Sequence, residues 1–109
     1  MKKQAVVTRG RGRGRTRQGI QKLEDIPNIG PSLAADLRQV GILRPAELAG
    51  RDAYRLYDNL CRVTGERQDP CVLDTFMSAV RYMEGAPALP WWHYTPERKR
   101  RWPTLGAGH

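Results

Sequence analysis

Ile26-Pro27-Asn28-Ile29-Gly30-Pro31 is the stretch that decides how this chain folds. Pro27 and Gly30 break any helix that arrives from the N-terminal side. Pro31 suits the first turn of a new helix, because its missing N–H would have no intrahelical partner there. The stretch therefore predicts a tight turn between two helices. The two isoleucines would plug the turn into the core, Gly30 would permit the sharp bend, and Asn28 would adopt a left-handed conformation or cap the turn.

Helical spacing of apolar residues continues on both sides of the turn, and no segment gives a convincing strand pattern. We expect an all-α domain at residues 17–97, a small bundle of about five short helices. The expected helices lie at residues 16–24, 31–40, 45–48, 52–65 and 69–85. Asp52 and Asp69 are the expected N-caps of the last two of these helices. The buried stripes of the expected helices would consist of Ile20, Leu23, Leu33, Ala34, Leu37, Val40, Ala53, Leu56, Tyr57, Leu60, Val72, Leu73, Phe76, Met77, Val80 and Met83.

The positive charge of the chain lies at its two ends. Residues 1–17 hold seven Lys or Arg and no acid, and residues 98–101 are all basic. Residues 18–97 hold eight cations and all eleven acids, so the middle of the chain is slightly acidic. The net charge of +8 favours a polyanionic partner.

The two basic ends are the segments expected to attract nucleic acid over distance. Residues 1–16 alternate arginine with glycine and have nothing to bury, so we expect a disordered tail. It would bind DNA, or RNA, without sequence preference through counterion release, and the alternative is a solvated extension without function. A basic C-terminal tail is expected at residues 98–109. The cations expected to contact phosphate are Arg9, Arg11, Arg13, Arg15, Arg98, Lys99, Arg100 and Arg101.

Length and composition exclude several classes of protein. A chain of 109 residues is one small domain, in which a large enzyme cleft is not expected. No apolar run is long enough to span a membrane, and the N-terminus lacks the pattern of a secretory signal. Two cysteines do not make a disulfide framework. A cytoplasmic protein with reduced thiols is expected.

The predicted turn would leave backbone N–H groups pointing outward at the start of the second helix, where the helix dipole also favours an anion. Its residues resemble the helix–hairpin–helix motif of repair and recombination proteins, with Leu23 before the turn and Ala34 and Leu37 after it. That resemblance implies contact with a DNA phosphate, which carries no sequence information. The donors it implies are the backbone N–H groups of Asn28, Ile29, Gly30 and Ser32.

The motif departs from its relatives at the start of the second helix. The family often carries Lys or Arg there, where this chain has Ser32 and Leu33, and Pro31 removes one possible donor. The alternative is a hairpin that serves only for packing. We favour phosphate contact, with most of the affinity coming from the two basic ends.

A longer resemblance covers roughly residues 20–100. The chain resembles the bacterial pathogenicity-locus family of small helix–hairpin–helix proteins, many of which are called mitomycin resistance proteins. The resemblance implies the fold more than the activity. The first half also resembles the C-terminal domain of the competence regulator TfoX. The elements that carry the longer match, besides the hairpin, are Gly41-Ile-Leu, Tyr54 to Cys61, Asp69-Pro70-Cys71, Ala79-Val-Arg-Tyr82 and Pro90-Trp91-Trp92.

Aromatic residues gather beside the C-terminal cations. Trp91, Trp92, Tyr94 and Trp102 could stack on exposed bases while Arg98 to Arg101 follow phosphates. The alternative is that Trp91 and Trp92 fold back and close the core, and we favour it because a domain this small needs the burial.

No set of residues looks catalytic, and no cofactor or metal site is expected. Cys71 follows a predicted helix cap, where the dipole would lower its pKa. A reactive thiol, or a redox pair with Cys61, is therefore an alternative to two structural cysteines. A metal site would have to recruit His93 from the tail at poor spacing.

These patterns predict a non-enzymatic, sequence-independent DNA-binding protein that acts in DNA repair or in resistance to DNA damage. The acidic middle motivates a second hypothesis, a protein-interaction module that uses the hairpin as a docking surface. A thiol enzyme that uses Cys71 is the third.

Overall fold

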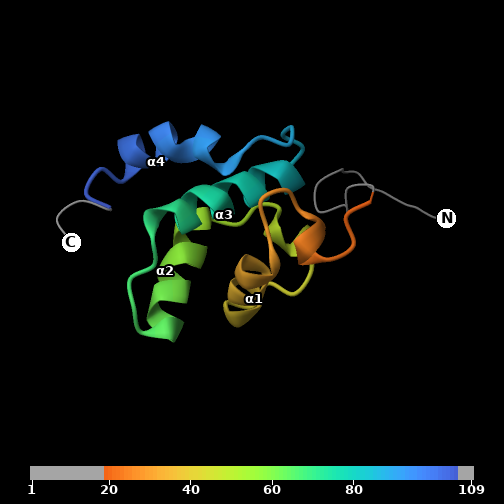
Figure 1. The fold of residues 1–109 in the computed structure, drawn as a ribbon, viewed down its shortest axis with the longest axis horizontal. Helices are drawn as coiled ribbons and strands as arrows, with labels where there is room; N and C mark the ends of the chain where they lie inside the picture. Colours follow the sequence, from red (N-terminus) through yellow and green to blue (C-terminus); the bar gives the residue numbers. More distant parts are fainter. Residues whose placement is uncertain (1–18, 106–109) are drawn as a thin grey trace.

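Helix α3 (Pro70–Met83) is the centre of the structure, a computed structural model that describes residues 19–105. Figure 1 shows helix α4 (Thr95–Arg101) on one side of α3, and helices α1 (Pro31–Gln39) and α2 (Ala53–Thr64) on the other. Three short 3-10 helices complete the described part of the chain: η1 (Leu23–Asp25), η2 (Pro45–Leu48) and η3 (Trp91–Tyr94). Every regular element between residues 19 and 105 is helical, which confirms the all-α prediction.

The boundaries of α1, α2 and α3 follow from local signals in the sequence. Pro31 and Pro70 occupy the first turns of α1 and α3. The Asp52 carboxylate caps α2 by accepting hydrogen bonds from two backbone N–H groups of the first turn, and Asp69 caps α3 through the N–H of Cys71. Gly65 ends α2 in the left-handed conformation, with φ 74°. The predicted ends of these helices are confirmed to within a residue or two.

The core forms around α3, against which α2, η2 and η3 pack, while α1 packs against α2. The apolar stripes predicted for α1, α2 and α3 lie in this core or against it. The fully or nearly fully buried side chains are Ile20, Leu23, Ile26, Ile29, Ala34, Leu37, Ile42, Leu48, Leu56, Tyr57, Leu60, Leu73, Phe76, Met77, Ala79, Val80, Met83 and Tyr94.

The helix predicted at residues 16–24 is wrong over its described part. Residues 16–18 lie outside the described range, and only Leu23–Asp25 forms a turn of 3-10 helix. The backbone of Lys22 is extended, and the Asp25 carboxylate accepts hydrogen bonds from the N–H groups of Gln21 and Lys22 at 3.0 and 3.1 Å. These two N–H groups are therefore held by a local cap, so the helix cannot extend upstream.

The segment after Gly85 is more structured than predicted. Residues 98–101, expected in a basic tail, belong to α4, which ends at Arg101. Since Arg98 is the one buried residue of α4, the helix has no apolar stripe that a periodicity analysis could detect. The predicted N-terminal tail with Arg9, Arg11, Arg13 and Arg15 lies outside the described residues. Among residues 19–105, none of the helices has the length and apolar composition that a membrane span requires.

Candidate nucleic-acid interface

The turn between η1 and α1 is built around Asn28. Its backbone φ is 73°, the only positive value outside glycine among the described residues. The N–H of Ile29 donates to the carbonyl of Ile26 at 3.0 Å, as in a type II β-turn with Pro27 and Asn28 at its centre. Ile26 and Ile29 are 1% and 3% exposed, so both plug the turn into the core as predicted.

The Asn28 side chain fastens the turn to the rest of the fold. Its Nδ2 donates to the hydroxyl of Ser78 on α3 at 3.2 Å and to the carbonyl of Leu89 at 2.8 Å. Gly30 does not make the sharp bend that its glycine suggested, because its φ of −90° and ψ of −174° are ordinary extended values. Instead, Gly30 is the N-cap of α1 and has no side chain with which to cap it.

Three of the four predicted phosphate donors have a free backbone N–H. Within residues 19–105, the N–H groups of Asn28, Gly30 and Ser32 make no hydrogen bond, and all three residues are exposed. The prediction was wrong for Ile29, since its N–H is already paired with Ile26 inside the turn. The N–H of Leu33, at the same end of α1, is a further free donor that the resemblance did not indicate. The turn thus presents a cluster of open donors at the start of a nine-residue helix.

Asn28 offers a test that separates backbone strain from side-chain bonding. We expect Asn28→Gly to lower the free energy of unfolding by about 1–3 kcal/mol, because two hydrogen bonds are lost and Ser78 is left buried. Asn28→Ala should cost about 1 kcal/mol more, since alanine resists the left-handed conformation that glycine adopts freely. Urea unfolding of the two variants measures the difference. Equal stability of the two variants would contradict the strained turn.

The exposed cations near the C-terminus are fewer than predicted. Lys99 and Arg100 are exposed on α4 and make no ion pair among the described residues. Arg101 pairs with Glu97 at 3.3 Å, and its guanidinium lies over the Trp102 ring at 4.5 Å. Arg98 is only 8% exposed, so the prediction that it belongs to an exposed basic run was wrong.

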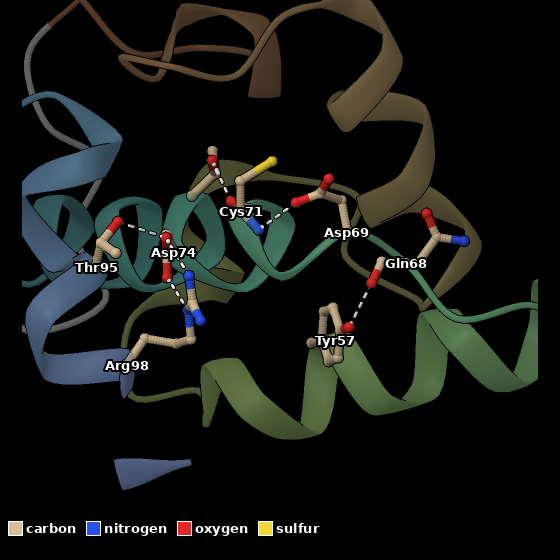
Figure 2. A network of polar contacts seen from close by, with 8 residues as sticks. Tyr57, Gln68, Asp69, Cys71, Asp74, Thr95 and Arg98 are labelled. Carbon is tan, nitrogen blue, oxygen red and sulfur yellow. Dashed lines mark hydrogen bonds and ion pairs between the residues drawn. The ribbon is translucent and has the colours of Figure 1, made fainter. Parts of the chain in front are cut away.

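Arg98 instead anchors α4 on α3. Its Nε donates to one Asp74 carboxylate oxygen at 2.8 Å, and the Thr95 hydroxyl donates to the other at 2.6 Å. Figure 2 shows both side chains reaching from α4 to Asp74 on α3. A second pair joins the same helices, between Arg81 and Glu97 at 2.7 Å, and lowers the pKa of the Glu97 carboxyl. Buried Asp74 needs such partners, because an unpaired buried carboxylate is very costly.

A pocket of about 770 Å³ lies beside this anchor, between the start of α3, η3 and α4. Trp91 and Trp92 form part of its wall, with ring centroids 5.5 Å apart and planes at 86°. Our preference for these tryptophans closing the core was wrong, since Trp92 is 61% exposed and neither ring belongs to the core. Tyr94 fills that place, at 5% exposure. The Trp102 ring is also engaged within the fold, because it stacks on the Tyr54 ring with the two centroids 5.1 Å apart.

Cys71 lines the same pocket but lacks the activated thiolate that a helix start suggested. Burial, together with the Asp69 carboxylate, raises the pKa of the Cys71 thiol to about 11. The thiol therefore stays protonated near neutral pH. Cys61 and Cys71 are both free thiols. Within residues 19–105, no group of three or more His, Cys, Asp or Glu side chains is placed to hold a metal ion.

Comparison with known proteins gives two matches to this chain. The model of a family described as "Pathogenicity locus" matches residues 16–100. A protein from Streptomyces lavendulae named mitomycin resistance protein McrB is 49% identical over 87 residues, which are 80% of this chain and 81% of that protein. No solved structure matches the chain.

Proposed function

Because this chain belongs to the pathogenicity locus family, we propose that it is a sequence-independent DNA-binding protein with a role in mitomycin resistance. The name of the Streptomyces relative motivates the role in mitomycin resistance, and the hairpin motivates the binding of DNA. In this proposal the chain is not an enzyme and needs no cofactor. It would work in the cytoplasm by occupying DNA in repair or damage tolerance.

The observation that carries the proposal is the cluster of open N–H groups at the start of α1. Asn28, Gly30, Ser32 and Leu33 offer donors that no described atom accepts from, and backbone donors at a helix N-terminus suit a phosphate oxygen. Contacts of this kind fix a protein on the DNA backbone without reading bases. A role independent of sequence therefore follows from the chemistry of the turn.

The hairpin would hold one phosphate, and cations elsewhere would supply most of the attraction. The single cation of α1, Arg38, is paired with Glu24 at 3.0 Å, so α1 adds little charge of its own. Lys99 and Arg100 are exposed on α4. The N-terminal arginines, outside the described residues, carry the largest block of positive charge, and the same tail could attract RNA.

The test of the proposal is a salt titration of duplex DNA binding by the full chain, compared with Gly30→Asp. A Cβ at residue 30 meets no atom within 4 Å, so the substitution fits. An aspartate there would cap α1, so the variant should be at least as stable as the original chain. Its carboxylate would also occupy the phosphate site and repel a DNA phosphate from it. We expect a several-fold loss of affinity and a salt slope shallower by about 0.9, the value for one phosphate contact.

Gly30→Ala is the matched control, because it fits the same space and leaves the donors open. Its DNA affinity should equal that of the original chain. A full chain whose DNA binding is absent, or does not depend on salt, would end the DNA-binding proposal. Gly30→Asp is expected to be at least as stable as the original, and urea unfolding of the variant checks that lost binding does not come from unfolding.

The second candidate function is a protein-interaction module. It is favoured by the acidic middle of the chain and by the exposed apolar side chains Leu43 and Val63, at 63% and 57%. Under this alternative, Gly30→Asp would leave DNA affinity unchanged and release a defined partner protein. The same set of variants therefore separates the two functions.

A further inference from the structure

The pocket between α3, η3 and α4 has an aromatic wall that the hairpin contact does not use. Trp92 keeps 61% of its surface exposed, although a small domain gains stability by burying such a side chain. The perpendicular rings of Trp91 and Trp92 make a corner, and the exposed surface of Trp92 is available to a flat group. An exposed aromatic corner beside a pocket is a feature of binding sites more than of packing.

The floor of the pocket is polar and only partly satisfied. The Asp74 carboxylate is used up by Arg98 and Thr95. The Arg98 guanidinium, 8% exposed, gives Nε and Nη2 to that carboxylate, while its Nη1 makes no hydrogen bond within residues 19–105. Arg98 lines the pocket, so this buried group is a donor for an oxygen on whatever enters. Lys99 lines the same pocket and is exposed to solvent, where it can meet an anion.

We propose that this pocket binds an unpaired nucleotide of DNA, with its base against the Trp91–Trp92 corner and its phosphate at Lys99. The inference rests on the proposed DNA-binding function and deepens it, because it assigns a preference for DNA with unpaired bases. Inside the pocket, Arg98 Nη1 would donate a hydrogen bond to the carbonyl oxygen of a pyrimidine or guanine base.

The chemistry of the lining favours a nucleotide over a purely apolar ligand. A base offers a π-face for stacking, polar edges for a buried donor, and a linked phosphate for a cation at the rim. Asp69 and Asp74 balance Arg98 and Lys99 among the charges of the lining, so a neutral base fits the interior better than a free anion does. The volume of about 770 Å³ lies within the usual range for small-molecule sites.

The experiment compares a short oligothymidylate with an abasic strand of the same length, which keeps the phosphates and removes the bases. Each is titrated into the full chain and into Trp92→Ala, with tryptophan fluorescence and anisotropy as readouts. The original chain should prefer oligothymidylate by about 5- to 150-fold, the effect of one stacked base. Trp92→Ala should lose most of that preference and keep its affinity for the abasic strand.

Trp92→Phe is the rescue variant, because it restores a stacking face, and it should recover part of the preference. Leu43→Ala is the matched control for removing an exposed apolar side chain elsewhere, and it should change neither affinity. Equal binding of both strands by the original chain would overturn the pocket assignment and leave the DNA-binding proposal standing. A preference that survives in Trp92→Ala would also overturn it. Absence of binding to either strand and to duplex would remove the proposed function itself.

Discussion

Replacing Asp74 with alanine is expected to lower the free energy of unfolding by about 3–5 kcal/mol. The substitution leaves the Arg98 guanidinium buried at 8% exposure without its carboxylate, and it removes the acceptor of the Thr95 hydroxyl. Domains are typically stable by only about 5–15 kcal/mol, so this loss would unfold the chain or free α4 from α3. Urea unfolding followed by far-UV circular dichroism measures the change.

An exposed ion pair supplies the control for this prediction. Asp58 pairs with Arg62 at 3.1 Å on the surface of α2, and Asp58→Ala should change stability by no more than about 1 kcal/mol. The double variant Asp74→Leu, Arg98→Met should recover most of the loss, because it removes both buried charges together. If Asp74→Ala were as stable as Asp58→Ala, the buried anchor described above would be wrong.

Deleting residues 1–17 is expected to have the largest effect on DNA affinity. The segment carries seven of the 19 cations and no acid. Each cation that neutralises a phosphate contributes about −0.9 to the slope of log affinity against log salt concentration for duplex DNA. If most of the seven engage, the slope should become shallower by several units, and affinity at low salt should fall by orders of magnitude.

The matched control keeps the length of the tail and replaces its seven cations with glutamine. It should behave like the deletion, because the predicted contribution is charge and not shape. Combined with the deletion or with the glutamine variant, Gly30→Asp should cause a further, smaller loss of DNA affinity. The two losses should add, since the turn and the tail would contact different phosphates. A salt slope unchanged by the deletion would assign the affinity to the described residues and not to the tail.

The sequence predicted the parts of the fold that depend on local signals. Caps and first-turn prolines at Pro31, Asp52 and Asp69-Pro70 placed three helices correctly, because each satisfies backbone groups within a few residues. The turn was also predicted, and the left-handed conformation expected at Asn28 is confirmed, whereas the sharp bend expected at Gly30 was wrong. The open donors at the start of α1 follow from the same local pattern, with Ile29 as the exception.

The parts that failed depend on contacts between distant residues. Helix α4 has no apolar stripe, and Arg98, Glu97 and Thr95 hold it through partners on α3. The basic run at residues 98–101 therefore predicts a tail, unless it is known that Asp74 on α3 lies opposite Arg98. The exposure of Trp92 was misjudged for the same reason, because it depends on how distant segments pack. The pKa of the Cys71 thiol, expected to be lowered by the helix start, is raised first by burial, which the adjacent sequence does not reveal, and then by nearby Asp69.

The two hydrogen bonds of Asn28 also have a consequence for the order of folding. They join residues separated by 50 and 61 positions, so each closes a long loop. Contacts of such sequence separation form late, after the chain has paid the entropy of bringing its halves together. We therefore expect the turn to reach its final geometry only when α3 and the segment before η3 are in place. A synthetic peptide of the hairpin alone would lack this restraint, and a nascent chain would present the donor cluster only once Leu89 has been made.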